Sequence, residues 1–211
     1  MVSNRTRLAG WALVVGTVVA TVGYLAANAV TGSGDARFTN SLWTPLNSLA
    51  IAGDIIMLLG LPAILAVHGH RAAKLTLVGY VGLFAALAML NVSEGCIEAY
   101  IKPYLVRHGG IPADAPGGFA VFDDVALVML LVGLICLGIA VIRARVLGWW
   151  VGALLIASPL VSFVGLSGPF ALISDYLAFV AIFTIGVKAV RLSGGPTAQA
   201  LAADTAVRVA A

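Results

Sequence analysis

Six long apolar runs, separated by short polar segments, are the feature that most constrains how this chain folds. Each run has about 20 residues, the length that a helix needs to cross a hydrocarbon core of about 30 Å. The runs cover residues 8–30, 46–67, 75–101, 119–142, 147–166 and 169–190. The strands of a membrane β-barrel would show alternation over about ten residues, whereas these runs are continuous. They predict an all-α bundle of six transmembrane helices forming one domain, 1–191, followed by a flexible cytoplasmic tail, 192–211.

The composition excludes a soluble protein. The chain is 61% hydrophobic and only 10% charged, whereas a soluble domain carries about 25% charged residues. The first run is longer than the apolar stretch of about 7–15 residues in a signal peptide, which favours a transmembrane helix. We therefore expect a multi-pass protein of the cell membrane, most simply the bacterial inner membrane, with the lipid bilayer as its constant partner.

The basic residues predict the orientation of the helices. With six crossings, three of the twelve Lys and Arg residues fall on one side of the membrane, at Arg37, Lys102 and Arg107. The other nine fall on the side of both termini, at Arg5, Arg7, Arg71, Lys74, Arg143, Arg145, Lys188, Arg191 and Arg208. Because positive residues stay in the cytoplasm, both termini are predicted to be cytoplasmic. The net charge of +3 thus follows from topology and does not indicate a nucleic-acid partner.

Acidic residues within the apolar runs are the strongest functional signal. An ionisable group at membrane depth is costly and usually faces the interior of a bundle. Counting along each run at 1.5 Å per residue places all of these acids in the outer half of the bundle. They are Asp54, Glu94, Glu98, Asp123, Asp124 and Asp175. The pattern predicts one buried polar site built by several helices.

Helical spacing adds two amides to this site. Asn91, Glu94 and Glu98 are three and four residues apart and share one helix face, as do Asn47 and Asp54 at a spacing of seven. Two carboxylates one turn apart repel each other when both are charged, so one of them retains its proton or a cation lies between them.

Most of the acidic residues, and His108, also have a simpler interpretation that involves no function. Asp123 and Asp124 lie near the start of a helix, where the macrodipole favours acids, and Glu98 can pair with Lys102 four residues later. Asp54 and Asp175 have no basic residue at helical spacing, although a buried aspartate can also serve only to fix helix register. The longest loop, 102–118, is long enough to act as a lid. His108 within it is either a supporting residue of the site or a solvated loop residue.

Several classes of site are disfavoured by what the sequence lacks. It has no mid-helix histidine for haem, no mid-membrane lysine for retinal and no phosphate-binding glycine loop or HExxH sequence. Cys96 and Cys136 lie at different depths and are expected to remain free thiols. No cofactor and no metal site is predicted.

These observations leave two main hypotheses. The first is a membrane-embedded enzyme that uses a neutral buried carboxylic acid to protonate a lipophilic prenyl-, terpene- or sterol-like substrate, with a second carboxylate accepting a proton. Asp54 or Glu94 is the expected acid and Asp175 its partner, with Asn47, Asn91, Glu98, Asp123, Asp124 and His108 as supporting groups. Membrane terpene cyclases and sterol isomerases use similar chemistry, but this sequence carries no signature of either. The second hypothesis is a proton- or cation-coupled transporter or channel. A third is a non-catalytic accessory protein. A homo-oligomer is compatible with each of them.

Overall fold

The computed structural model describes residues 2–32, 34–69, 72–112, 114, 116–163 and 173–193, and within them it contains helices and no strands. Five helical spans in this part of the chain are long and apolar enough to cross a membrane. They are Asn4–Val30, Trp43–His68, Ala73–Arg107, Gly117–Ala144 and Ile173–Ser193. The prediction of an all-helical, multi-pass membrane protein is therefore supported. A further apolar helix, α7, covers Trp149–Phe163 and is shorter than these spans.

The spans are built from α1 (Val2–Val30), α2 (Trp43–Gly60), α3 (Pro62–His68), α4 (Ala73–Ala86), η2 (Leu87–Glu94), η3 (Ile97–Ile101), α5 (Lys102–Arg107), α6 (Gly117–Ala144) and α8 (Ile173–Ser193). A short 3-10 helix, η1 (Gly34–Thr39), joins α1 to α2. The segments η2 and η3 are π-helical. The last part of the fifth predicted run, the start of the sixth and the tail from 194 lie outside the described residues.

The third span differs from its predicted form. It continues as α5 beyond the predicted end at Ile101 and reaches Arg107, with Pro103 in the first turn of α5. Pro103 has no backbone N–H to donate, and it lies where the span passes from the π-helical η3 into α5. The predicted loop 102–118 is correspondingly shorter, because its first part is helical and Gly117 already belongs to α6.

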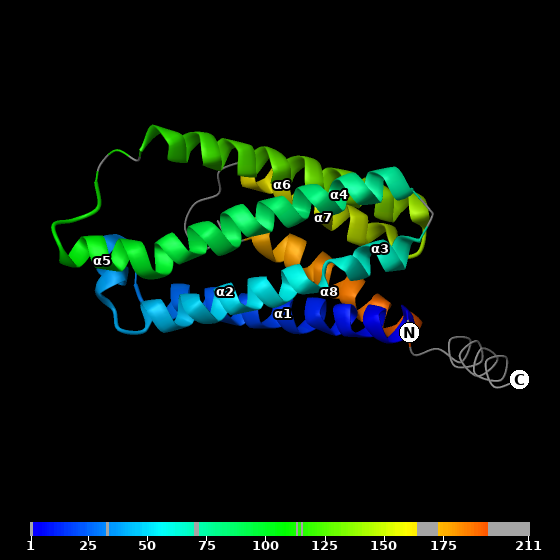
Figure 1. Ribbon diagram of the computed structural model, residues 1–211, viewed down its shortest axis with the longest axis horizontal. Helices are drawn as coiled ribbons and strands as arrows, with labels where there is room; N and C mark the ends of the chain where they lie inside the picture. Colours follow the sequence, from blue (N-terminus) through cyan, green and yellow to red (C-terminus); the bar gives the residue numbers. More distant parts are fainter. Residues whose placement is uncertain are drawn as a thin grey trace, which may run out of the picture.

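The helices form a closed ring in which each span packs against the next. The helix α1 packs on α2 and α8, α4 packs on α6, and α7 lies between α6 and α8. Contacts of α3 with α4, and of α2 with η2, close the ring. Figure 1 shows the helices running along the long axis, with η1 and α5 at one end, which we call the α5 end. The N-terminus and α3 mark the opposite, or α3, end.

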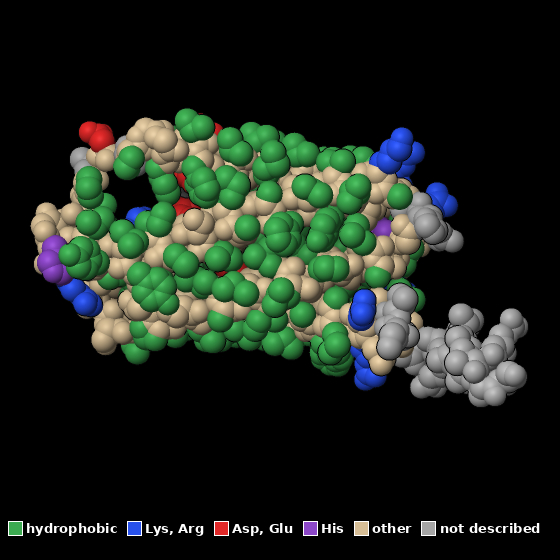
Figure 2. All heavy atoms as spheres, viewed as in Figure 1, with side chains coloured by type: hydrophobic (Ala, Val, Ile, Leu, Met, Phe, Trp, Pro, Cys, Tyr) green, Lys and Arg blue, Asp and Glu red, His purple; other side chains and the backbone are tan. Residues whose placement is uncertain are grey.

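The surface has the polarity expected of a membrane protein. Hydrophobic side chains cover the length of the bundle, and Lys and Arg side chains gather at its two ends (Figure 2). Large apolar residues such as Leu59, Val81 and Val128 are more than half exposed. Because a membrane protein needs no polar coat over its apolar middle, this pattern agrees with a bundle surrounded by lipid.

Apolar side chains fill the half of the bundle nearer the α3 end. Leu61, Ile64, Leu137, Leu155 and Ile185 are all fully buried there and belong to one continuous cluster. The buried polar residues in or next to this half are Thr17, His68 and Thr76, whereas the acidic residues of the spans lie toward the α5 end.

Close approach of α1 and α2 depends on small residues. A Cβ atom added to Gly53 would lie 2.3 Å from the backbone nitrogen of Ala20, which is nearer than atoms can pack. In membranes, glycine at such contacts lets two helix backbones approach directly. This contact fixes how the polar residues of α1 and α2 face each other.

We expect Gly53→Ala to lower the free energy of unfolding by about 1–3 kcal/mol, the usual cost of overpacking. The measurement is the thermal unfolding midpoint of the purified protein in detergent. Gly118→Ala is the matched control, because nothing lies within 4 Å of the added Cβ. An unchanged midpoint for Gly53→Ala would contradict the close contact between α1 and α2.

Candidate functional site

Asp54 lies where three spans meet and is fully buried. The Tyr24 hydroxyl donates a hydrogen bond to its Oδ2 at 2.7 Å, and the Asn91 amide donates one to its Oδ1 at 3.2 Å. Burying a carboxyl group without such partners costs several kcal/mol or more. The two hydrogen bonds therefore stabilise Asp54 and also join α1, α2 and η2.

The π-helical geometry of η2 is part of this arrangement. A π-helix has more residues per turn than an α-helix and often occurs at functional sites. Asn91 and Glu94 belong to η2, and Glu98 belongs to η3. All three line one cavity, so the shared face expected from their spacing is kept although the segment is not a regular α-helix.

A cavity of about 510 Å³ lies inside the ring of helices. Its polar lining consists of Tyr24, Asn28, Arg37, Asn47, Asn91, Glu94, Glu98, Ser158, Ser162, Asp175 and Tyr176. Its apolar lining consists of Trp43, Leu83, Leu87, Leu90, Leu127, Leu130, Leu134, Ala178, Phe179 and Ile182. Figure 2 shows an opening at the α5 end with acidic side chains at its edge.

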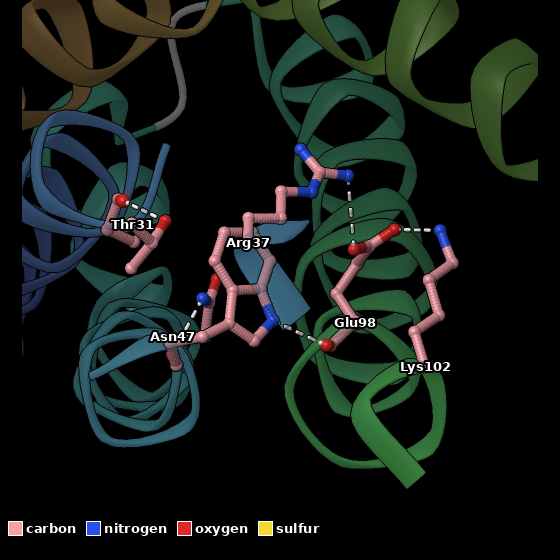
Figure 3. Close-up of polar contacts among 7 residues, drawn as sticks. Thr31, Arg37, Asn47, Glu98 and Lys102 are labelled. Carbon is pink, nitrogen blue, oxygen red and sulfur yellow. Dashed lines mark hydrogen bonds and ion pairs between the residues drawn. The ribbon is translucent and has the colours of Figure 1, made fainter. Parts of the chain in front are cut away.

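A cluster of charged side chains joins η1 to the third span at the α5 end (Figure 3). Glu98 forms ion pairs with Arg37, at 3.6 Å, and with Lys102 one turn later on its own helix. The indole N–H of Trp43 donates to the Glu98 carbonyl at 2.8 Å. The Arg37 guanidinium also lies over the ring of Trp43, 4.9 Å from its centre. The predicted pairing of Glu98 with Lys102 is thus present, and Arg37 adds a second cation.

Glu94 and Asp175 face the cavity without a cation of their own among the described residues. Glu94 experiences the negative charges of Asp123 and Glu98, partly offset by Lys102. Asp175 accepts a 3.4 Å hydrogen bond from the Ser174 hydroxyl. Its charge also acts on Asp54 and Tyr24. The carboxyl groups therefore form two electrostatic groups, one of Glu94, Glu98 and Asp123 and the other of Asp54 and Asp175.

Most of the predicted site residues line the cavity, and the others lie outside it. Glu94, Glu98, Asp175, Asn47 and Asn91 line the cavity, and Asp54 lies directly behind its wall, where Tyr24 and Asn91 cover it.

Two predicted supporting residues lie elsewhere. Asp124 is exposed on α6. His108 is exposed beyond the end of α5, where its ring stacks on Tyr104 and its Nδ1 lies 2.8 Å from the Tyr104 carbonyl. None of the described residues of the loop after α5 lines the cavity. Asp123 is partly buried beside Glu94 and acts on it only through its charge.

Tyr24, Tyr176 and Arg37 are among the site residues that the sequence analysis did not identify. Tyr24 and Tyr176 line the cavity, and Arg37 pairs with Glu98. Hydropathy does not single out a tyrosine, because this residue is common at membrane interfaces. The depth of Tyr24 within the first run was nevertheless visible, as was the position of Tyr176 directly after Asp175.

Among the described residues, no three His, Cys, Asp or Glu side chains are grouped so that they could bind a metal ion together. Cys96 and Cys136 are both free thiols.

No protein-family model, curated protein or solved structure matches this chain.

We expect Asp54→Leu to destabilise the protein by about 2–5 kcal/mol, because the Tyr24 hydroxyl and the Asn91 amide each lose their acceptor. Asp54→Asn keeps one acceptor and should cost less. The measurement is thermal unfolding in detergent, with Asp124→Asn as the control for an exposed acid. Adding Tyr24→Phe to Asp54→Leu should recover part of the loss. Fully additive effects would contradict a direct Tyr24–Asp54 hydrogen bond.

Proposed function

We propose that this protein is a membrane-embedded enzyme that isomerises or cyclises a lipophilic substrate of prenyl, terpene or sterol type by proton transfer from buried carboxyl groups. The observation that carries the proposal is the amphipathic cavity of about 510 Å³. Carboxyl, amide and hydroxyl groups share its wall with leucine and phenylalanine side chains. A volume of a few hundred Å³ is typical of small-molecule sites.

The apolar lining favours a hydrocarbon substrate. Leu83, Leu87, Leu127, Leu130 and Leu134 form a surface that offers no hydrogen bonds from side chains. Such a surface accommodates a hydrocarbon body without leaving a buried polar side chain unpaired. The carboxyl groups of the cavity wall then face a region from which the substrate excludes water. Electrostatic interactions are strong in such a region.

We assign Glu94 as the acid and Asp175 as the base. A proton on Glu94 relieves the repulsion among Glu94, Asp123 and Glu98. Glu94 gives this proton to one carbon of a C=C bond; the π electrons form the new C–H bond and leave a carbocation on the neighbouring carbon. The Asp175 carboxylate then takes a proton from an adjacent carbon, and the C–H electrons form a new C=C bond. Water at the cavity opening returns the proton from Asp175 to Glu94, so the net reaction is an isomerisation and needs no oxidant or reductant.

Asp54 has a positioning role in this proposal. Both of its oxygens accept hydrogen bonds and none of its surface is exposed. It therefore orients Tyr24 and Asn91 toward the cavity and does not touch the substrate. The aromatic ring of Phe179, stacked on Tyr24 at 6.4 Å between ring centres, offers a π face that can stabilise a nearby carbocation.

The filled half of the bundle argues against the transporter alternative. A transport path would need polar groups or water from the cavity to the α3 end. Among the described residues, Leu137, Val141, Leu155 and Ile185 are fully buried in that half. The Thr17 hydroxyl there donates to the carbonyl of Leu13 on its own helix, at 2.7 Å.

We further propose that α7 completes a sixth crossing and that both termini are cytoplasmic, in a bacterial inner membrane. The uneven distribution of Lys and Arg supports this orientation. With this topology the cavity opens toward the outer leaflet. Homo-oligomers are compatible with the proposal and are not required by it.

The activity is tested with the purified protein in phosphatidylcholine vesicles, supplied with a panel of prenyl alcohols and linear terpenes in D₂O. Products are separated by gas chromatography and mass spectrometry. We expect isomers or cyclised products that carry deuterium at the protonated carbon. Glu94→Gln and Asp175→Asn should each lower the rate by about 10²–10⁴-fold, the usual contribution of general acid–base catalysis.

Asp124→Asn is the matched control and should leave the rate unchanged, because Asp124 is exposed and does not line the cavity. Full activity of both Glu94→Gln and Asp175→Asn on any converted substrate would disprove the assigned chemistry. Products without deuterium would disprove protonation as the first step.

The orientation is tested by labelling single cysteines in intact cells, after Cys96 and Cys136 are replaced by serine. A membrane-impermeant maleimide should react with Asp114→Cys, in the loop after α5, and not with Ala73→Cys at the start of α4. Both positions are exposed, so both should react after the cells are permeabilised. Labelling of Ala73→Cys alone in intact cells would reverse the proposed topology.

A further inference from the structure

A second hollow lies on the outside of the bundle, between α1 and α8. This groove, which we call the α1–α8 groove, has a volume of about 500 Å³. It is lined by Thr17, Val18, Thr21, Val22, Tyr176, Phe179, Val180, Phe183 and Thr184. None of these residues is charged, and Val18, Val22 and Val180 are each about half exposed.

The threonines do not make the groove polar. The hydroxyl of Thr21 donates to the carbonyl of Thr17 at 2.7 Å, and that of Thr184 donates to the carbonyl of Val180 at 2.7 Å. The Thr17 hydroxyl is likewise bound to its own helix. Because these donors are used within the helices, the groove presents methyl groups and rings to whatever fills it. Its surface therefore fits a hydrocarbon chain.

The groove lies beside a close contact of α1 and α8 toward the α3 end. A Cβ added to Gly186 there would lie 2.9 Å from the Cβ of Leu13. Further along the two helices, the side chains from Thr17 to Val22 and from Tyr176 to Thr184 line open space instead. The separation of the helices thus falls at the depth of the internal cavity.

Two residues, Tyr176 and Phe179, line both the groove and the cavity. Phe179 is nearly buried and its ring stacks on that of Tyr24, whose hydroxyl is held by Asp54. The Tyr176 oxygen is buried and has no hydrogen-bond partner in the described part of the chain. A buried hydroxyl without a partner is unusual and calls for an explanation such as a ligand.

We propose that the α1–α8 groove holds the hydrocarbon chain of the cavity's substrate, and that Tyr176 and Phe179 form the wall through which the substrate passes from the bilayer to the carboxyl groups. The proposal rests on the proposed function and specifies its substrate. The substrate is an amphiphile with a flexible hydrocarbon chain and a small oxygen-containing head that accepts a hydrogen bond from Tyr176. The substrate thus reaches the site sideways from the lipid and does not cross the aqueous opening.

The test uses a farnesol analogue with a photoreactive diazirine, added to the full-length protein in phosphatidylcholine vesicles. Labelled residues are identified by mass spectrometry after brief illumination at a series of times. In the wild-type protein we expect labels both in the groove, on α1 and α8, and in the cavity, on η2 and α6, with excess farnesol removing both. Thr21→Trp fills the groove and should slow cavity labelling at least tenfold.

Val128→Trp is the matched control, because Val128 is exposed on α6 and lines neither hollow. Val18→Trp serves as a second groove-filling variant in case Thr21→Trp unfolds. Phe179→Ala removes the shared wall and should speed cavity labelling. Tyr176→Phe should weaken binding of the alcohol probe about five- to tenfold, as expected for one lost hydrogen bond, and leave binding of the corresponding hydrocarbon unchanged.

The outcomes separate the two proposals. Slower cavity labelling in the groove-filling variants, with no effect of Val128→Trp, supports lateral access. Cavity labelling at the wild-type rate in both Thr21→Trp and Val18→Trp overturns lateral access and leaves the proposed enzyme intact. A wild-type cavity that no probe labels overturns the proposed function and the lateral route with it.

Discussion

The hydrogen bonds of Asp54 are the interaction on which the polar half of this bundle depends. The carboxyl group is buried at membrane depth and is bound by Tyr24 from α1 and Asn91 from η2. Helices in a bilayer gain little from apolar contact with each other, because lipid tails are equally apolar, so polar contacts and close packing decide how they associate. The Asp54 group supplies the polar contact, and the nearby Gly53 supplies the close packing. Together they hold the first three spans at the orientation that leaves a cavity between them.

The same interaction determines where the ring is filled and where it is hollow. Toward the α3 end, apolar side chains from each helix meet and exclude space for a ligand. Toward the α5 end, carboxyl and amide groups cannot interdigitate in that way, because each needs a hydrogen-bond partner or a charge partner. Some find one, as Glu98 does with Arg37 and Lys102. Glu94 and Asp175 line the cavity instead. The bundle therefore has a polar cavity toward the α5 end and an apolar core toward the α3 end.

Much of the fold could be predicted from the sequence, because a chain in lipid must satisfy its backbone hydrogen bonds within each segment. Apolar runs of sufficient length therefore identified the helices, and the depth of the acids along those runs indicated the half of the bundle that holds the site. The continuation of the third span past Pro103 could not be predicted, since it depends on how the preceding π-helical turns are bonded. Tyr24 and Tyr176 were missed because their role follows from the partners that surround them and not from their hydropathy. Asp54 was identified as important, yet only the packing of α1 against α2 shows that it lies behind the cavity wall.

The π-helical segments give the third span a property that a regular helix would lack. In an α-helix each residue advances the side chains by about 100°, because there are about 3.6 residues in a turn. A π-helical turn accommodates an additional residue, so η2 and η3 change the angular phase between α4 and α5. If the same residues formed α-helical turns instead, the far part of the span would be rotated by about that angle for each additional residue. Glu98 would then turn away from Arg37 and Trp43 while α4 kept its contacts with α6. The π-helical form of this segment therefore sets the angle at which the two parts of the span meet the rest of the bundle.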